Sequence, residues 1–240
     1  MIAMGALAAG GLSACRTYSG SAAYIGDTRI TTTQVDSTIA SLPKGSPVPA
    51  AEAQQLTLAY SALNAVAAKV GAQTGVATPK PDATEVSQIA SQLKVPANNK
   101  FVQLIAQGDA WLNALLAKAP KVTPTDADLM LVYNTLIADG TVFQGGPTPS
   151  FTDIRPQLQQ IPNLDQGLGL YQQMSAAAKS SDITINPRYA ASCTQIPCPS
   201  LEIPVFTVQL ASGQTVTALA VPLDDESHPV ALDPTPTPSA

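Results

Sequence analysis

The residues best suited to covalent or metal chemistry are three cysteines and a single histidine. Cys193 and Cys198 form a Cys-x4-Cys pair with Pro197 between them, and this spacing suits a local disulfide in an oxidising compartment. Zinc binding is the alternative, but these two cysteines and His228 are fewer than the four ligands of a structural zinc site. We therefore expect a disulfide between Cys193 and Cys198, and neither a metal site nor a cofactor.

The third cysteine follows a short apolar segment at the N-terminus. Residues 2–12 are rich in Ala and Gly, are too short to span a membrane, and lead into the sequence Leu-Ser-Ala-Cys at residues 12–15. This ending resembles a bacterial lipobox, in which cleavage precedes a cysteine whose thiol receives a diacylglycerol. A secretory signal followed by an incidental cysteine is the alternative. No Lys or Arg precedes the apolar run, so we expect that the natural start lies upstream of Met1 or that the start at Met1 is wrong.

The lipobox predicts both a modification and a location. We expect residues 1–14 to be a signal peptide and Cys15 to carry the acyl chains, palmitate among them. Two or three chains on one cysteine anchor a protein firmly, because burial of each methylene adds to the affinity for the bilayer. The predicted location is the extracytoplasmic face of the cell membrane, with residues 15–23 as a tether.

The remaining polar residues do not match a known catalytic arrangement. His228 lies between Ser227 and Pro229 in an acidic, proline-rich segment, where a base would have no fixed nucleophile beside it. Acidic pairs such as Asp126 with Asp128 are explained by the start of a helix. No glycine-rich phosphate loop follows a predicted strand, and a net charge of -5 gives no basic surface for nucleic acid. We expect no enzymatic activity and no nucleotide or nucleic-acid partner.

Two short β-branched runs, far apart in the sequence, bracket the part of the chain that must position any site. Tyr24 to Thr31 is the first, with a bend or bulge at Gly26-Asp27, and Asp182 to Tyr189 is the second. We expect the two runs to pair as neighbouring strands. A two-stranded ribbon is marginal alone, so it should pack on the helices between them.

Apolar periodicity and capping residues predict several helices between the two strands. Asp82 to Glu85 has the form of a capping box, Pro124 suits a first helical position, and Thr152 or Asp153 suits an N-cap. The predicted helices cover residues 31–42, 50–70, 82–93, 101–118, the segment opened by Thr123-Pro124, and 151–180 with an interruption at Pro162. Ten apolar side chains on them are candidates for the core or for a peptide-binding groove: Leu63, Val66, Phe101, Leu104, Trp111, Leu115, Tyr133, Leu168, Tyr171 and Met174.

The C-terminal part is predicted to be of a different kind. Residues 201–210 and 214–221 alternate apolar and polar types around Ser212-Gly213, which predicts a β-hairpin. Residues 224–240 are acidic and then Pro-Thr-rich, a composition typical of disorder. The expected organisation is a helical domain at 24–189, a disulfide loop and hairpin extension at 190–223, and a disordered tail at 224–240.

The order of these features is similar to that of the SurA N-terminal domain-like lipoproteins of actinobacteria, relatives of the chaperone domains of SurA, PrsA and trigger factor. The likeness lies in Tyr24-Ile25-Gly26-Asp27 with Ile30-Thr31 and Val35, and in residues 123–133, 151–158 and 183–189. The resemblance implies a mainly α fold of the SurA and trigger-factor type, closed by the pairing of its N- and C-terminal strands and followed by a small hairpin.

The same resemblance implies a function. SurA and PrsA carry a parvulin prolyl isomerase domain between their later helices, but the corresponding interval here is only residues 139–150, far short of the roughly hundred residues of a small domain. The expected function is therefore a membrane-anchored chaperone, a holdase or folding factor that binds unfolded exported proteins without isomerase activity. The alternative is a non-catalytic lipoprotein that docks one folded partner in the cell envelope as an assembly or structural factor.

Overall fold

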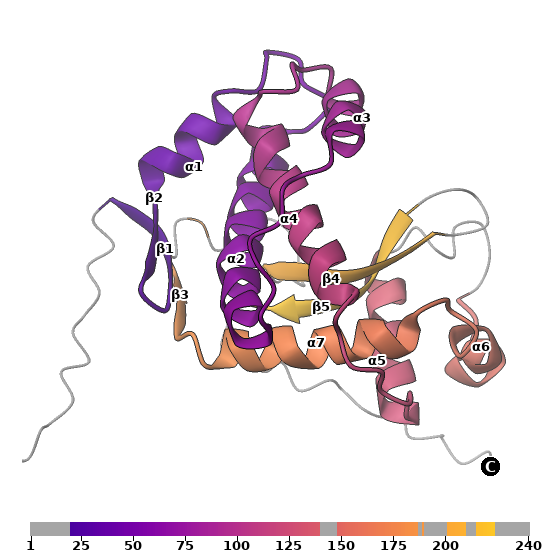
Figure 1. The fold of residues 1–240 in the computed structure, drawn as a ribbon. Helices are drawn as coiled ribbons and strands as arrows, with labels where there is room; N and C mark the ends of the chain where they lie inside the picture. Colours follow the sequence, from indigo (N-terminus) through magenta and orange to yellow (C-terminus); the bar gives the residue numbers. More distant parts are fainter. Residues whose placement is uncertain (1–19, 140–147, 187–188, 190–200, 210–214, 224–240) are drawn as a thin grey trace, which may run out of the picture.

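The computed structural model describes residues 20–139, 148–186, 189, 201–209 and 215–223. Within these residues the chain is mainly helical, with two small antiparallel sheets (Figure 1), which confirms the predicted fold class at this level. Cys15, Cys193, Cys198, His228 and the acidic proline-rich tail lie outside the described residues, so the lipidation, disulfide and disorder stay predictions. No helix in the described part is long and apolar enough to cross a membrane.

Seven helices lie in the described part of the chain, and most follow the predicted ranges. They are α1 (Thr32–Ile39), α2 (Ala50–Thr74), α3 (Ala83–Leu93), α4 (Lys100–Leu116), α5 (Asp126–Asp139), α6 (Phe151–Leu158) and α7 (Leu164–Lys179). The run from residue 151 to 180 is thus two helices in series, with the break around Pro162 as expected.

Capping residues fix several helix starts. Thr31 forms a reciprocal capping box with Gln34 at the start of α1. The Asp82 carboxylate accepts hydrogen bonds from two backbone N–H groups in the first turn of α3. The Glu85 side chain does not accept a bond from the Asp82 backbone in return, so only half of the predicted capping box forms. The expected caps of two other helices are wrong. Ser150, not Thr152 or Asp153, caps α6, because its hydroxyl reaches the backbone N–H of Asp153.

The start of α5 is also later than predicted. Thr125 and Asp128 exchange side-chain and backbone hydrogen bonds in the pattern of a capping box, so the helix begins at Asp126. Pro124 therefore precedes the helix and does not occupy its first position. The reciprocal hydrogen bonds satisfy the backbone N–H groups of Thr125 and Asp128, which a helix starting at Pro124 would leave bonded to water.

The predicted pairing of the two ends of the body is confirmed. β1 (Ser21–Ile25) pairs antiparallel with β3 (Ile183–Ile185), with Tyr24 opposite Thr184. The first run is not one bent strand, however. β1 turns at Gly26 and returns as β2 (Thr28–Thr31), giving a three-stranded sheet in the order β2-β1-β3. Gly26 has φ +57°, a conformation that glycine adopts without strain.

Polar side chains link β1 to the residue after β3, and link α2 to the turn between α7 and β3. The Asn186 amide donates to the carbonyl oxygen of Ser21 at 2.8 Å, and the Asn186 backbone N–H donates to Ala22 at 2.9 Å. Lys69 of α2 donates to the Ser180 carbonyl oxygen at 3.1 Å and to the Ser181 hydroxyl at 3.0 Å. A cation at the C-terminal end of α7 satisfies carbonyl groups and the helix dipole where the chain enters β3.

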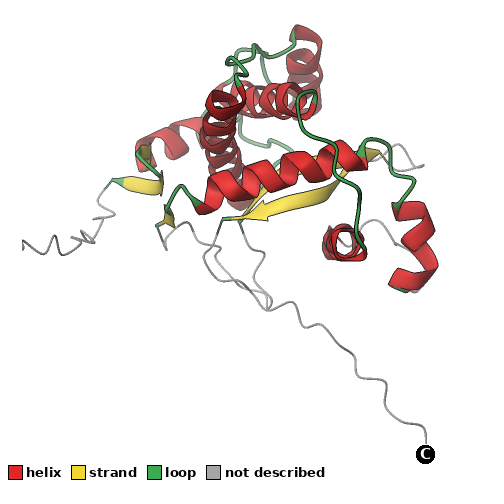
Figure 2. Cartoon of the chain, turned by 60° about the horizontal axis from the view of Figure 1, so that its bottom comes forward, coloured by secondary structure: helices red, strands yellow, loops and turns green. Residues whose placement is uncertain are grey.

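The predicted C-terminal hairpin is present and lies within the core. β4 (Glu202–Gln209) and β5 (Thr215–Pro222) pair antiparallel, and Figure 2 shows α7 running along the hairpin. The register shifts around Phe206, so the consecutive residues Val205 and Phe206 are both buried. Val205 joins the cluster around α2, whereas Phe206 joins the cluster around α5.

The buried side chains form three clusters. The first cluster joins α2 to the three-stranded sheet, the C-terminal part of α4 and α7; the second joins α5, α6 and α7 to the hairpin; the third joins α3 to the N-terminal part of α4. The hairpin contributes buried residues to both the first and the second cluster, so it connects these two parts of the core.

Candidate functional site

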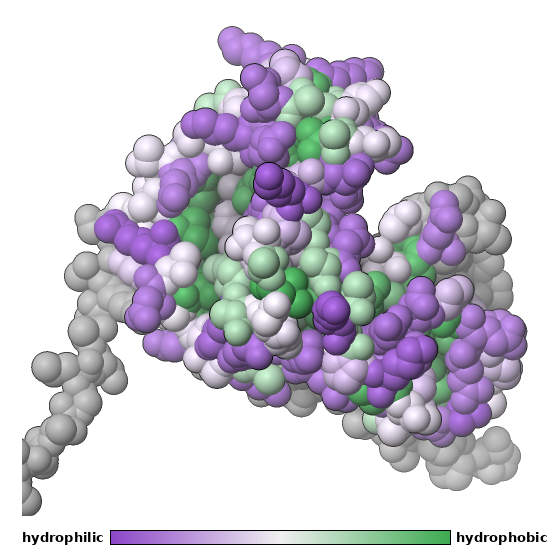
Figure 3. Space-filling model, viewed as in Figure 1, coloured by the Kyte–Doolittle hydropathy of each residue, from purple (hydrophilic) through white to green (hydrophobic). Residues whose placement is uncertain are grey.

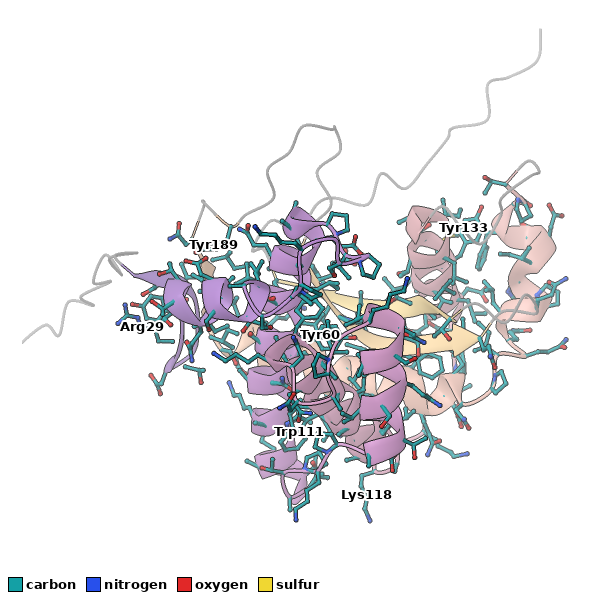
Figure 4. The ribbon with its side chains drawn as sticks, turned by 90° about the horizontal axis from the view of Figure 1, so that it is seen from above. Arg29, Tyr60, Trp111, Lys118, Tyr133 and Tyr189 are labelled. Atoms are coloured by element: carbon teal, nitrogen blue, oxygen red, sulfur yellow. The ribbon has the colours of Figure 1, made fainter. Side chains whose placement is uncertain are left out.

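The ten apolar candidates belong mainly to the core. The seven that are buried are Leu63, Val66, Phe101, Trp111, Leu115, Leu168 and Met174. The three that are half-buried are Leu104, Tyr133 and Tyr171. Figure 4 shows how far apart some of them lie, with Trp111 among the central helices and Tyr133 at one end of the molecule. None of the ten lines the cleft between α4, α6 and β4.

That cleft lies between the α3–α4 side of the molecule and the β4–α6 side. It has a volume of about 950 Å³. Figure 3 shows the surface hollowed between the lobe that carries α3 and the lobe that carries the end of the hairpin and α6. A volume of this size is at the upper end of the range for small-molecule pockets and is enough for several residues of an extended peptide.

One wall of the cleft is mainly apolar and comes from α4 and from α6 with the turn that follows it. Leu112 and Leu116 lie one turn apart on α4 and are half-buried. Ile154 lies in the middle of α6, and Ile161 lies in the turn that follows α6. Side chains four residues apart on a helix share a face, which is why α4 presents two leucines together. This wall offers apolar surface that a bound chain would remove from water.

The other wall is strand β4, seen along its edge. Six consecutive β4 residues, from Pro204 to Gln209, line the cleft, whereas β5 contributes only Thr215. The opposite edge of β4 is hydrogen-bonded to β5. Among the described residues, the backbone from Pro204 to Gln209 makes no hydrogen bond beyond that pairing. The cleft therefore borders a row of unpaired backbone donors and acceptors.

Two glycines in α7 allow close packing, one against strand β4 and one against the connection between α4 and α5. A Cβ atom at Gly167 would lie 2.7 Å from Cγ of the Phe206 ring, so only glycine lets the ring settle against the helix. A Cβ atom at Gly169 would collide with the backbone oxygen of Pro120, in the connection between α4 and α5. The helix thus accepts the hairpin at one glycine and an inter-helix connection at another.

The third part of the cleft is acidic. Tyr60 of α2 donates a hydrogen bond from its hydroxyl to Oδ1 of Asp109 on α4 at 3.4 Å, and Glu85 of α3 lies near both. Burial and the nearby Glu85 carboxylate raise the pKa of Asp109 to about 6. Burial and the Asp109 carboxylate raise the pKa of the Tyr60 hydroxyl, and burial raises the pKa of Glu85.

The close approach of Tyr60 to α4 depends on Gly108. A Cβ atom there would lie 2.6 Å from Cδ1 of Tyr60 and 2.8 Å from Cδ2 of Leu63. Figure 4 shows Tyr60 near the centre of the molecule. Without the glycine, the ring would be displaced from its hydrogen bond with Asp109.

This arrangement offers binding surface but not a metal centre. In the described part of the chain, no group of three or more His, Cys, Asp or Glu side chains is placed to hold a metal ion. Comparisons with protein-family models, with curated proteins and with solved structures find no match to this chain. The chemistry of the cleft is that of its apolar wall, its unpaired strand edge and its two carboxylates.

Little in the sequence predicts this site. The capping pattern accounts for Glu85, and residues 204–209 are predicted only as part of the hairpin, a candidate contact for a docked partner. No local pattern marks Tyr60 or Asp109 as part of a site. One signal is present: Asp109 follows Ile105 by four residues and precedes Leu112 by three, so a carboxylate interrupts an apolar face of α4. An acidic residue in such a position is a reason to look for a polar partner on another helix.

Proposed function

We propose that the protein is a membrane-anchored extracytoplasmic chaperone, a holdase or folding factor that binds unfolded segments of exported proteins in the cleft. The observation that carries the proposal is the 950 Å³ cleft with an apolar wall on α4 and around α6. The resemblance to the SurA, PrsA and trigger factor chaperone domains supports it. The chaperone-type fold that this resemblance implies is part of the proposal.

The physical basis of such binding is burial of apolar surface. Each Å² of apolar area removed from water contributes about 25 cal/mol, but ordering a flexible client offsets much of that gain. The expected result is modest affinity and broad selectivity for extended apolar segments. No nucleotide is needed, because capture and release follow the client's own folding.

Suppression of aggregation tests this function directly. The purified chain from Arg16 to Ala240 should reduce light scattering of several unrelated unfolded proteins at near-stoichiometric ratios. Ile154→Ser in the apolar wall should weaken the effect. Ile39→Ser is the matched control, because Ile39 is also a half-buried isoleucine on an eight-residue helix but lies outside the cleft. Unchanged aggregation with the unmodified chain would contradict the proposal and favour the docking of one folded partner.

The anchor is tested separately. With Cys15 as the lipid-bearing residue, Cys15→Ser should release the protein from the membrane fraction into the soluble extracytoplasmic fraction. Retention of Cys15→Ser in membranes would reject the lipid anchor. This outcome would not affect the aggregation assay, which uses a chain without the anchor.

A further inference from the structure

The edge of β4 gives the cleft a feature that simple apolar binding does not require. Strand β4 has eight residues, and its edge borders the cleft over Pro204 to Gln209. At about 3.3 Å per residue, this edge is about 20 Å long, the usual length of a strand. Natural proteins generally cover or interrupt an edge of this length, since it can pair with another extended chain.

The surroundings of the edge restrict what can pair with it. Strand addition places alternate side chains of the incoming segment on opposite faces of the sheet. Apolar side chains from α4 and the α6 region line the cleft beside this edge, Leu112 and Ile161 among them. An incoming strand whose every second side chain is apolar would bury that set against the helices.

The charge of the cleft restricts the segment further. Glu85 and Asp109 are the charged residues of the lining, and all the lining residues are described; none of them is Lys, Arg or His. The two carboxylates therefore have no basic side chain beside them in the cleft. A basic residue on the bound segment would supply the missing counter-charge.

We infer that the occupant of the cleft is an extended polypeptide segment that adds to the free edge of β4 as a third strand, with alternating apolar residues and a Lys or Arg facing Asp109 and Glu85. This inference rests on the proposed function and specifies its client. Backbone hydrogen bonds to β4 give affinity for many sequences. The apolar wall and the two carboxylates select among them.

Backbone pairing is tested with a peptide whose backbone N–H donors can be removed by N-methylation. The probe is an alternating Val-Thr peptide of about ten residues with Lys at both ends, long enough to span the edge. Two isomers are N-methylated, one at every Val and the other at every Thr. Because alternate N–H groups point to opposite edges of a strand, one isomer should bind the purified protein like the parent peptide. The other should bind about tenfold more weakly or worse.

The result that would overturn strand addition is equal affinity of the two isomers, whether both bind or both fail. Recognition by side chains alone predicts that equality. If the protein suppresses aggregation but does not distinguish the isomers, the proposed function stands and strand addition is rejected. If it neither suppresses aggregation nor binds the parent peptide, both are rejected.

Charge selection is tested on the same peptide with norleucine in place of Lys. The Lys peptide should bind about fivefold more tightly, and Asp109→Asn combined with Glu85→Gln should abolish the difference. Asp36→Asn is the matched control, because Asp36 is an exposed carboxylate on α1 outside the cleft. Equal binding of the two peptides to the unmodified protein would overturn the charge selection. So would a difference that survives in the double variant.

Discussion

The two sheets of this protein use their edges in opposite ways. In the three-stranded sheet, β1 is paired on both sides, and its neighbours β2 and β3 have only four and three residues. In the β4–β5 hairpin each strand has eight residues, and one edge of β4 faces the cleft. The first sheet closes the body of the protein, whereas the second leaves backbone groups of β4 unpaired along the cleft.

The difference follows from edge length. A free edge of three or four residues offers too few hydrogen bonds to recruit another chain, whereas an edge of six offers a useful template. Pro204 limits this template at one end because it has no backbone N–H. The contrast predicts that changes around β4 affect both stability and binding, and that changes in the first sheet affect stability alone.

The largest effect is expected at Phe206, which is 6 % exposed and anchors β4 in the second cluster. Phe206→Ala should lower the free energy of unfolding by about 3–5 kcal/mol, because it removes buried apolar surface and leaves a cavity. Urea unfolding followed by circular dichroism measures the loss. A change below about 1 kcal/mol would show that β4 is not held through this ring.

Gly167→Ala should have a smaller effect, a loss of about 1–3 kcal/mol, because the new methyl group would collide with the Phe206 ring. The same substitution in the Phe206→Ala background should be neutral or stabilising by up to about 1 kcal/mol, since alanine favours a helix over glycine. Additive losses in the double variant would mean that the two residues are not in contact.

Asp109 should make stability depend on pH. Its pKa is raised from 3.8 to about 6 in the folded protein, so the unfolded chain ionises first as the pH rises. Stability should therefore fall between about pH 4 and pH 6 and change no further above that range, by on the order of 2 kcal/mol. Urea unfolding at pH 4 and pH 7 should show a smaller fall for Asp109→Asn. An equal fall in this variant would assign the pH dependence to other groups, of which Glu85 shifts in the same direction.

The smallest effect is expected in the first sheet. Asn186→Ala removes the side-chain hydrogen bond to the Ser21 carbonyl oxygen and should cost about 1 kcal/mol in unfolding experiments. The affinity for the Lys-containing peptide should not change, because the three-stranded sheet lies outside the cleft. Weakened peptide binding by a folded Asn186→Ala variant would show that the first sheet also affects binding, contrary to the contrast between the two sheets.

Local patterns were enough to predict most elements of the fold. The Asp82 cap and the alternation in the C-terminal hairpin both involve residues close in sequence. The pairing of the first and last strands of the body was predicted by elimination, since few other β-branched runs were available. The errors at Pro124 and Ser150 were choices between neighbouring capping residues, which local propensity separates by only about 1 kcal/mol.

The sequence by itself determined the mainly helical class, the helix positions and the presence of both β segments, because hydrophobic period and helix caps are set by residues within a few positions of each other. Only the tertiary structure decided that the hairpin joins two buried clusters and that β4 presents its edge to a cleft. It also brought Tyr60, Glu85 and Asp109 together from three helices. Such a site depends on where whole elements pack, which no single stretch of the chain encodes.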